Sequence, residues 1–175
     1  MKIIGDGQQA QIIKHLTAHL QLDSLYHHIA IGSPAIRKKV AETELEPHTP
    51  LYNVSFDAPH LPCPCHFRGH GAYISPVNTS IGFCVFINTH AVIEHDCTIG
   101  DYVNVNPGAI LCGGVTVGNL STIGAGAIIR EGITIGEGVT IGAGSVVTKN
   151  VPDGAIWAGI PARRLNRRKK SKLTK

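Results

Sequence analysis

A six-residue periodicity constrains this chain more than any other feature of its sequence. An apolar residue recurs at every sixth position from Ile81 to Val147, twelve times without a gap. An α-helix would scatter such residues around its surface, because six matches neither the 3.6-residue turn nor the heptad. Short strands joined by tight turns keep them on one side. The residue four places after each apolar one is small or β-branched, so two inward positions of every hexad are restricted in size.

Three hexads predict one triangular coil of 18 residues, which returns the chain above itself. Such coils would stack at the interstrand spacing of about 4.8 Å, each strand pairing with the coils on either side. The large apolar residue would fill the prism while the small one leaves it room. Twelve hexads give four full coils, and residues 71–80 (GAYISPVNTS) resemble an imperfect opening coil. With 20 glycines in 175 residues and only 16% charged residues, an all-β repeat fits better than disorder or a helical bundle.

Glycine directly follows the leading apolar residue in six of the twelve hexads. We expect these positions to lie at tight corners, where glycine would supply freedom in φ. The six are Gly82, Gly100, Gly118, Gly124, Gly136 and Gly142.

The chain before and after the repeats differs in kind. Residues 1–70 begin with the short apolar strand KII and a helix-like stretch, QQAQIIKHLTAHL, and continue with a second strand and helix in HHIAIGSPAIRKKVAE. Residues 46–66 are rich in proline and predict a linker without regular structure. We therefore divide the chain into a truncated α/β segment and linker (1–70), the β-helix (71–153) and a C-terminal extension (154–175).

Charge and cysteine content restrict the class of protein. Residues 163–175 hold eight of the 16 lysines and arginines, so the net charge of +4 hides an acidic body and a basic tail. An acidic body with a tail lacking aromatic residues argues against nucleic-acid binding. No apolar run reaches the length of a membrane span and no signal peptide leads the chain, so we expect a cytoplasmic protein. An odd set of cysteines without regular spacing predicts thiols: Cys63, Cys65, Cys84, Cys97 and Cys112.

Two phrases, NTHAVIEHDCTIGDYVNVNPGA and GAGSVVTKNVPDGAIWAGIPARRL, together with the hexads, resemble the hexapeptide-repeat acyltransferases. The resemblance covers residues 71–165 closely. It is strongest to the group that includes sialic acid O-acetyltransferases and N-acetyltransferases of nucleotide-linked amino sugars. It implies a left-handed parallel β-helix, assembly as a homotrimer, and acetyl-coenzyme A bound in the grooves between subunits. The implied activity is acetyl transfer to a sugar hydroxyl or amine in the biosynthesis of surface polysaccharide, through a ternary complex.

The resemblance places the catalytic base at His95, in IEHDC, and the carboxylate that sharpens it at Asp96. Attack on a thioester requires removal of a proton from the acceptor, for which an imidazole is suited at neutral pH. A neighbouring carboxylate fixes the imidazole tautomer and stabilises the imidazolium. Glu94 is the other candidate, and it ranks second because in a strand it points to another face. Composition alone would favour an ordinary surface histidine at His95; His90 is expected to be structural or to line the rim.

The same resemblance implies a set of ligand contacts. The two glycines at 113 and 114 would let a ligand approach the main chain, whose amide could steady the developing oxyanion; an ordinary tight corner is the alternative. Arginine near the exit of the repeats suits the phosphates of coenzyme A. The implied cofactor contacts are Asn104, Gly113, Ala125, Ala143 and Arg163.

The sugar is implied to bind near the N-terminal strand-to-helix turn, at Gly7, Gln8 and Gln9. This turn is a weak phosphate-binding signal because it contains Asp6. The segment also lacks a further strand with paired acidic residues that relatives have. The shortened segment favours O-acetylation of a sugar such as sialic acid over a nucleotide-linked substrate.

Two other readings remain open. A β-helical carbonic anhydrase would use three histidines around zinc, yet no histidine follows His95. A separate zinc site in the linker is disfavoured because its C-x-C spacing is short, so we predict no metal. A non-catalytic β-helix scaffold is the remaining alternative. The linker residues concerned are His60, Cys63, Cys65 and His66.

Overall fold

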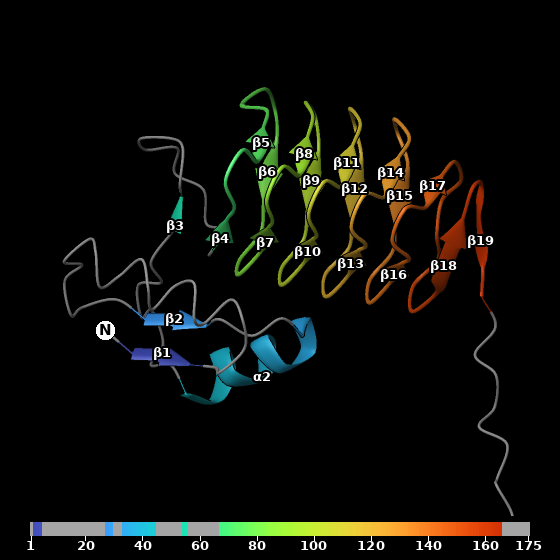
Figure 1. Cartoon of the computed structure of the whole chain (residues 1–175). Coiled ribbons are helices and arrows are strands. Elements are labelled where there is room, and N and C mark those ends of the chain that lie inside the picture. Colours follow the sequence, from blue (N-terminus) through green and yellow to red (C-terminus); the bar gives the residue numbers. More distant parts are fainter. Residues whose placement is uncertain (1, 5–26, 30–32, 45–53, 56–66, 166–175) are drawn as a thin grey trace, which may run out of the picture.

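The computed structural model describes residues 2–4, 27–29, 33–44, 54–55 and 67–165 of the chain. Residues 67–165 form a parallel β-helix in which each side of every coil is a two-residue strand (Figure 1). The strands stack into three parallel sheets, because residues about 18 apart in sequence lie side by side. The fold class predicted from the hexads, a β-helix with a small α/β segment before it, is confirmed.

We name the three faces sheet I, sheet II and sheet III. Sheet I contains β3 (Val54–Ser55), β4 (Phe67–Arg68), β7 (Phe86–Ile87), β10 (Asn104–Val105), β13 (Thr122–Ile123), β16 (Thr140–Ile141), β18 (Ile156–Gly159) and β19 (Ala162–Arg164). Sheet II contains β5 (Tyr73–Ile74), β8 (Val92–Ile93), β11 (Ile110–Leu111), β14 (Ile128–Ile129) and β17 (Val146–Val147). Sheet III contains β6 (Ser80–Ile81), β9 (Thr98–Ile99), β12 (Thr116–Val117) and β15 (Thr134–Ile135). The opening coil expected at residues 71–80 therefore supplies β5 and β6.

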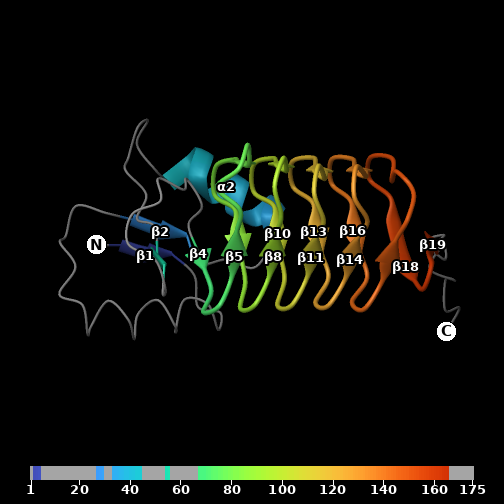
Figure 2. The same ribbon diagram turned by 90° about the horizontal axis from the view of Figure 1, so that it is seen from above.

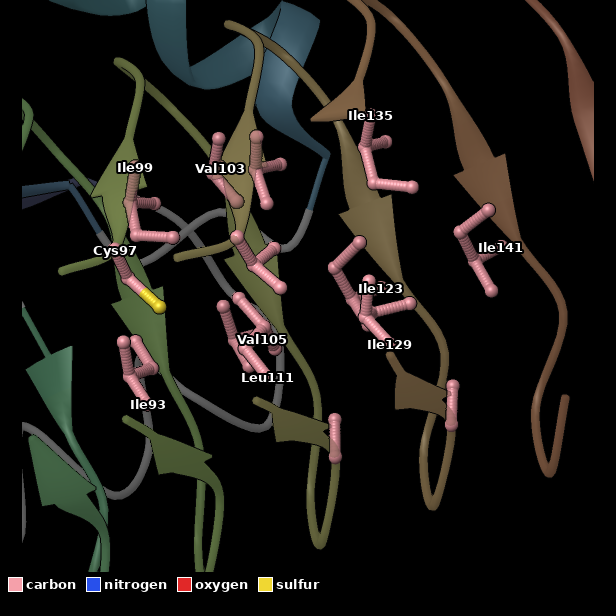
Figure 3. Packing of buried hydrophobic residues seen from close by; sticks show 14 of the residues in the cluster. Ile93, Cys97, Ile99, Val103, Val105, Leu111, Ile123, Ile129, Ile135 and Ile141 are labelled. Atoms are coloured by element: carbon pink, nitrogen blue, oxygen red, sulfur yellow. The ribbon is translucent and has the colours of Figure 1, made fainter. Parts of the chain in front are cut away.

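The core is the column of inward side chains expected from the hexads. Leading residues such as Ile93, Leu111 and Ile129 are fully buried, as are small partners such as Ala109 and Ala127. Figure 3 shows the leading residues of successive coils stacked behind one another inside the helix. Each coil thus buries apolar surface against both neighbours, which stabilises the stack through the hydrophobic effect.

The glycines that follow the leading residues are explained by close approach rather than by φ. None of the six has a positive φ. A Cβ added to Gly124 would lie 2.5 Å from the backbone nitrogen of Ala143, so only glycine lets the neighbouring coil come this close. The left-handed residues lie two positions later, for example Gly126 at φ 65° and Asp96 at φ 60°. Our expectation of conformational freedom at the six glycines was therefore wrong, and the neighbouring backbone is the physical reason.

The N-terminal segment contains β1 (Lys2–Ile4), which pairs in parallel with β2 (His27–Ile29), and the helix α2 (Pro34–Glu44). Both strands and the second helix agree with the sequence prediction, and the helix expected after KII lies outside the described residues. The helix α2 runs alongside the first coils (Figures 1 and 2). From this helix Arg37 is fully buried: its Nη2 donates to the carbonyl of Tyr102 at 2.8 Å, and its guanidinium lies 4.1 Å from the centroid of the Phe86 ring.

Two further features differ from or extend the expectation. The linker is not without regular structure, because β3 pairs in parallel with β4 and extends sheet I. At the other end, β18 and β19 form an antiparallel hairpin after the last full coil, with a cis peptide bond between Ile160 and Pro161. No helix in the described part of the chain has the length and apolar character needed to cross a lipid bilayer.

Candidate active site

His95 lies at the corner between sheets II and III. Val77, His95, Gly113 and Glu131 occupy equivalent places on successive coils, and we call this ridge the His95 corner. Main-chain hydrogen bonds link its coils: Asp96 N–H donates to the carbonyl of Val77 at 2.9 Å, and Gly114 N–H donates to that of His95 at 2.9 Å. The corner is therefore a fixed platform from which side chains project into solvent.

Three polar side chains form a chain of contacts on this platform. The Nδ1 atom of His95 lies 2.7 Å from Oδ2 of Asp96, and Nδ2 of Asn78 donates to Oδ1 of the same carboxylate at 3.0 Å. A carboxylate only accepts, so Nδ1 carries the proton and Nε2 has a free lone pair. The structure places Asp96, and not Glu94, against the imidazole.

The electrostatics of the carboxylate follow from these two contacts. The hydrogen bond from His95, and then that from Asn78, lower the pKa of Asp96 below its ordinary value. The side chains of His95 and Asp96 are 57% and 49% exposed, so an acceptor from solvent can reach them. An imidazole held in this way can take a proton on Nε2, and the carboxylate then stabilises the resulting imidazolium.

Gly113 makes room for the imidazole. A Cβ added to Gly113 would lie 2.6 Å from Cε1 and 2.8 Å from Nε2 of His95, which belongs to the preceding coil. The sequence argument assigned this glycine to the approach of a ligand, whereas the group that lies against it is a side chain of the protein. The N–H of Gly113 donates to no group within the described residues. It stays available as a donor beside the imidazole.

Ala125 and Ala143 lie together on a different corner, between sheets I and II. They are one coil apart, both are exposed, and Gly144 N–H donates to the carbonyl of Ala125 at 2.8 Å. The left-handed Gly126 and Gly144 beside them leave open space where side chains would otherwise project. Sheet II separates this corner, which we call the Ala125 corner, from the His95 corner.

The other two cofactor candidates are not brought to either corner. Asn104 is 7% exposed in β10, paired with Phe86 and Thr122, so little of its surface can contact a ligand. Arg163 is exposed in β19, where its Nη1 donates to the carbonyl of Ala162 at 2.9 Å. The substrate candidates Gly7, Gln8 and Gln9 lie outside the described residues. A single chain therefore does not gather the predicted contacts into one place.

The outer face of sheet II is apolar along its whole length. Tyr73, at 47% exposure, and Ile128, at 38%, are its most exposed members. The equivalent positions of sheet III are hydroxylated residues. The sequence carries this signal, because the residue before every third leading residue is apolar, but the hexad analysis considered only inward positions. The apolar face consists of Tyr73, Val92, Ile110, Ile128 and Val146.

The residues considered for metal binding do not converge in the described part of the chain. No group of three or more His, Cys, Asp or Glu side chains is close enough there to hold an ion. His90 lies at the Ala125 corner, across sheet II from His95, with its ring centroid 6.0 Å from that of His70. The linker candidates His60, Cys63, Cys65 and His66 lie outside the described residues.

Comparison with known proteins gives consistent matches. Residues 78–113 and 114–149 match the family model of the bacterial transferase hexapeptide (six repeats). GDP-perosamine N-acetyltransferase of Escherichia coli O157:H7 is 39% identical over 86 residues. That alignment covers 44% of this chain and 37% of the relative, so it spans little more than a third of the relative's length.

Two solved structures extend the likeness to almost the whole chain. The acetyltransferase domain of PglB from Neisseria gonorrhoeae superposes with a TM-score of 0.73 at 26% identity, covering 94% of this chain and 98% of that one. A mutant of perosamine N-acetyltransferase from Caulobacter crescentus, in complex with CoA and GDP-perosamine, gives a TM-score of 0.75 at 25% identity, covering 94% and 96%.

Proposed function

Since the chain carries the repeats of the hexapeptide acyltransferases, as its sequence resemblance indicated, we propose that it transfers an acetyl group from acetyl-coenzyme A to a sugar. The observation that carries this proposal is the 2.7 Å contact of His95 Nδ1 with Asp96, which leaves Nε2 free on an exposed corner. We place the reaction in the cytoplasm, in the biosynthesis of surface polysaccharide.

We propose that His95 acts as a general base within a ternary complex. Its Nε2 takes the proton from the acceptor as the acceptor attacks the thioester carbonyl carbon. One bond forms between the acceptor and that carbon, the carbon–sulfur bond breaks, and the imidazolium returns the proton to the sulfur. Asp96 stabilises the imidazolium, and the free N–H of Gly113 is placed to donate to the oxyanion. Proton transfer of this kind contributes about 10² to 10⁴ in rate.

The acceptor is best supported as an amino sugar. The relative at 39% identity is named for N-acetylation of GDP-perosamine, and a structural relative contains CoA and GDP-perosamine together. These comparisons favour an amine on a nucleotide-linked sugar over the sialic acid hydroxyl suggested by the shortened N-terminal segment. Gly7, Gln8 and Gln9 remain our proposed contacts for this acceptor.

A homotrimer would explain why the predicted residues are divided between two corners. The His95 corner and the Ala125 corner lie along opposite edges of the apolar face of sheet II. If three copies close around a threefold axis through these faces, the His95 corner of one copy meets the Ala125 corner of the next. The apolar face would then be buried, as exposed apolar patches usually are in assemblies.

The coenzyme would lie in the groove formed between two such copies. Ala125 and Ala143 present a smooth ridge without large side chains, along which a narrow ligand can contact the main chain. Arg163, exposed beyond the last coil, suits the phosphates. The burial of Asn104 makes it a support of sheet I in this proposal, rather than a direct contact.

Thiol release from acetyl-coenzyme A tests the proposal. The acceptor panel contains nucleotide-linked amino sugars, free amino sugars and sialic acid, and we expect the first class to be acetylated fastest. His95→Ala should lose at least about 10² in kcat, while His90→Ala, on the other corner, should retain it. Full turnover by His95→Ala would refute the role of the base, and absence of turnover with every sugar would refute the function. Turnover by a metal-free preparation would exclude a zinc enzyme.

A further inference from the structure

The second contact of the Asp96 carboxylate points to a further residue in the site. We propose that Asn78 is a positioning residue that orients Asp96 toward His95, an inference that rests on the proposed function of His95. The contact is the hydrogen bond of 3.0 Å from Asn78 Nδ2 to Asp96 Oδ1, which leaves Oδ2 for the imidazole. Nothing in the sequence resemblance marked this asparagine.

Three hydrogen bonds join the Asn78 turn to the turn that carries His95. Besides the amide bond to the carboxylate, Asp96 N–H donates to the carbonyl of Val77 at 2.9 Å, and Thr79 Oγ1 donates to that of Glu94 at 3.1 Å. These flank the amide on both sides. The position of Asn78 relative to the carboxylate is therefore fixed by the stacking of two coils, so the amide can hold one orientation.

The backbone at this ridge accommodates the pair specifically. Asn78 and Asp96 adopt left-handed φ angles of 53° and 60°, and the next two coils have glycines, Gly114 and Gly132, at the same place. Asparagine and aspartate tolerate this conformation better than other non-glycine residues. Along the described part of this ridge, non-glycine residues thus occupy the left-handed position where they bear on His95, and glycine takes over beyond it.

A comparison with another corner separates this arrangement from ordinary turn chemistry. At the corner between sheets III and I, Asp101 Oδ1 accepts from the backbone N–H of Phe83 at 2.7 Å, and Asn119 Oδ1 accepts from that of Asp101 at 2.8 Å. Those side chains connect coils through the main chain, as Asx residues commonly do. Asn78 instead donates to a side chain, and that side chain contacts the imidazole.

The amide also acts on the charge of the site. As a neutral donor it favours the ionised carboxylate, and it is the second contribution that lowers the pKa of Asp96. The other charged groups at this corner are Glu94, just before His95, and Glu131, two coils further on, which pairs with Arg130 at 3.5 Å. Replacing the amide by a carboxylate would put a further negative charge beside Asp96 and favour the imidazolium form of His95.

Two variants test the inference without disturbing the turn, because glycine and aspartate both tolerate a positive φ. Asn78→Gly removes the donor, and we expect kcat to fall about threefold to tenfold, the size of one hydrogen bond to a charged group. Asn78→Asp should move the acid limb of the pH–rate profile to higher pH, because the base is then protonated over a wider range. Leu120→Gly, at φ 61° on another corner, is the matched control and should change neither.

Imidazole NMR gives a readout that does not depend on turnover. The His95 signal is assigned by its loss in His95→Ala and titrated in each full-length variant. We expect a higher pKa in Asn78→Asp and a changed population of the Nδ1–H tautomer in Asn78→Gly. If both variants titrate like the parent, Asn78 is only a turn residue and the inference fails, even when the enzyme is active. If no sugar is acetylated but the titrations change, the proposed function fails and the coupling of Asn78 to His95 stands.

Discussion

The imidazole of His95 lies against the α-carbon of Gly113, a residue 18 positions further along the chain. The space for the ring exists only because Gly113 has no side chain: an added Cβ would lie 2.6 Å from Cε1. This relationship couples the candidate base to the coil that follows it. The first prediction tests that coupling.

Gly113→Ala should reduce activity more than stability. The backbone φ of Gly113 is not in the left-handed region, so alanine is tolerated there, but the added methyl group displaces the flexible end of His95. A displacement of about 1 Å costs on the order of 10²-fold in kcat. Steady-state kinetics and the thermal midpoint are measured together. Gly132→Ala, at φ 66° with open space around it, is the control and should lose stability while it keeps activity. Parental kcat in Gly113→Ala would contradict the coupling.

Asp96→Asn should remove a stabilising contribution that depends on pH. The pKa of Asp96 is lowered in the folded state, chiefly by the hydrogen bond from His95, so the parent gains stability above the unfolded value of about 3.8. That gain is lost as the pH falls through the lower folded pKa. Urea unfolding should therefore show the parent more stable than the variant at pH 7, with the difference closing below about pH 3.8. An equal difference at both pH values would exclude the ionised contact as its source.

Ile128→Glu should dissociate the proposed trimer. Ile128 is exposed at 38% on the apolar face of sheet II, and a carboxylate buried there without a partner would be strongly unfavourable. Thr116→Glu, on the exposed face of sheet III, carries the same new charge and should leave the assembly intact. Sedimentation velocity distinguishes the species. We expect activity to be lost with dissociation, and a trimeric Ile128→Glu would show that another face mediates assembly.

Gly124→Ala should destabilise the fold more than Gly126→Ala. The added methyl group of the first would lie 2.5 Å from the backbone nitrogen of Ala143, and a neighbouring backbone cannot move aside as a side chain can. We expect a loss of at least about 2 kcal/mol there, as for overpacked sites. Gly126 has open space and a φ of 65°, so alanine costs it about 1 kcal/mol. Chemical denaturation measures both, and the reverse order would restore φ as the reason for these glycines.

Glu137→Asn should stabilise the β-helix. Along the corner between sheets III and I, Asp101, Asn119 and Asp153 each accept a hydrogen bond from the backbone N–H of the preceding coil, at 2.7–2.8 Å. Glu137 occupies the equivalent place without making this bond in the described structure. A shorter side chain would complete the series and add about 0.5–1.5 kcal/mol. Glu137→Gln, equally neutral but as long as glutamate, should leave the unfolding free energy unchanged; a gain as large as that of Glu137→Asn would point to charge instead.

Much of the site could be placed from the sequence only as a list of residues. His95 and Asp96 are adjacent in the chain, so their contact follows from local geometry once one corner is fixed. The link to Asn78 and the fit of Gly113 against the ring span 18 residues, and neither could be predicted without the coil register. Asn104 shows the opposite difficulty, because the hexads place it outward while it lies buried at 7% exposure.

The sequence by itself determined that the chain is a stacked solenoid, and which positions face its interior. The reason is that steric limits inside the prism repeat in every hexad, so Ile93 and Cys97 can be identified from size and spacing alone. Only the tertiary structure decided which side chains meet across coils and which face remains apolar and open. Those contacts depend on stacking register, and β5 pairs Ile74 with Ile93, 19 residues away instead of 18. A single residue gained in one coil moves every later corner relative to the earlier ones, and spacing along the chain does not reveal where such a shift is absorbed.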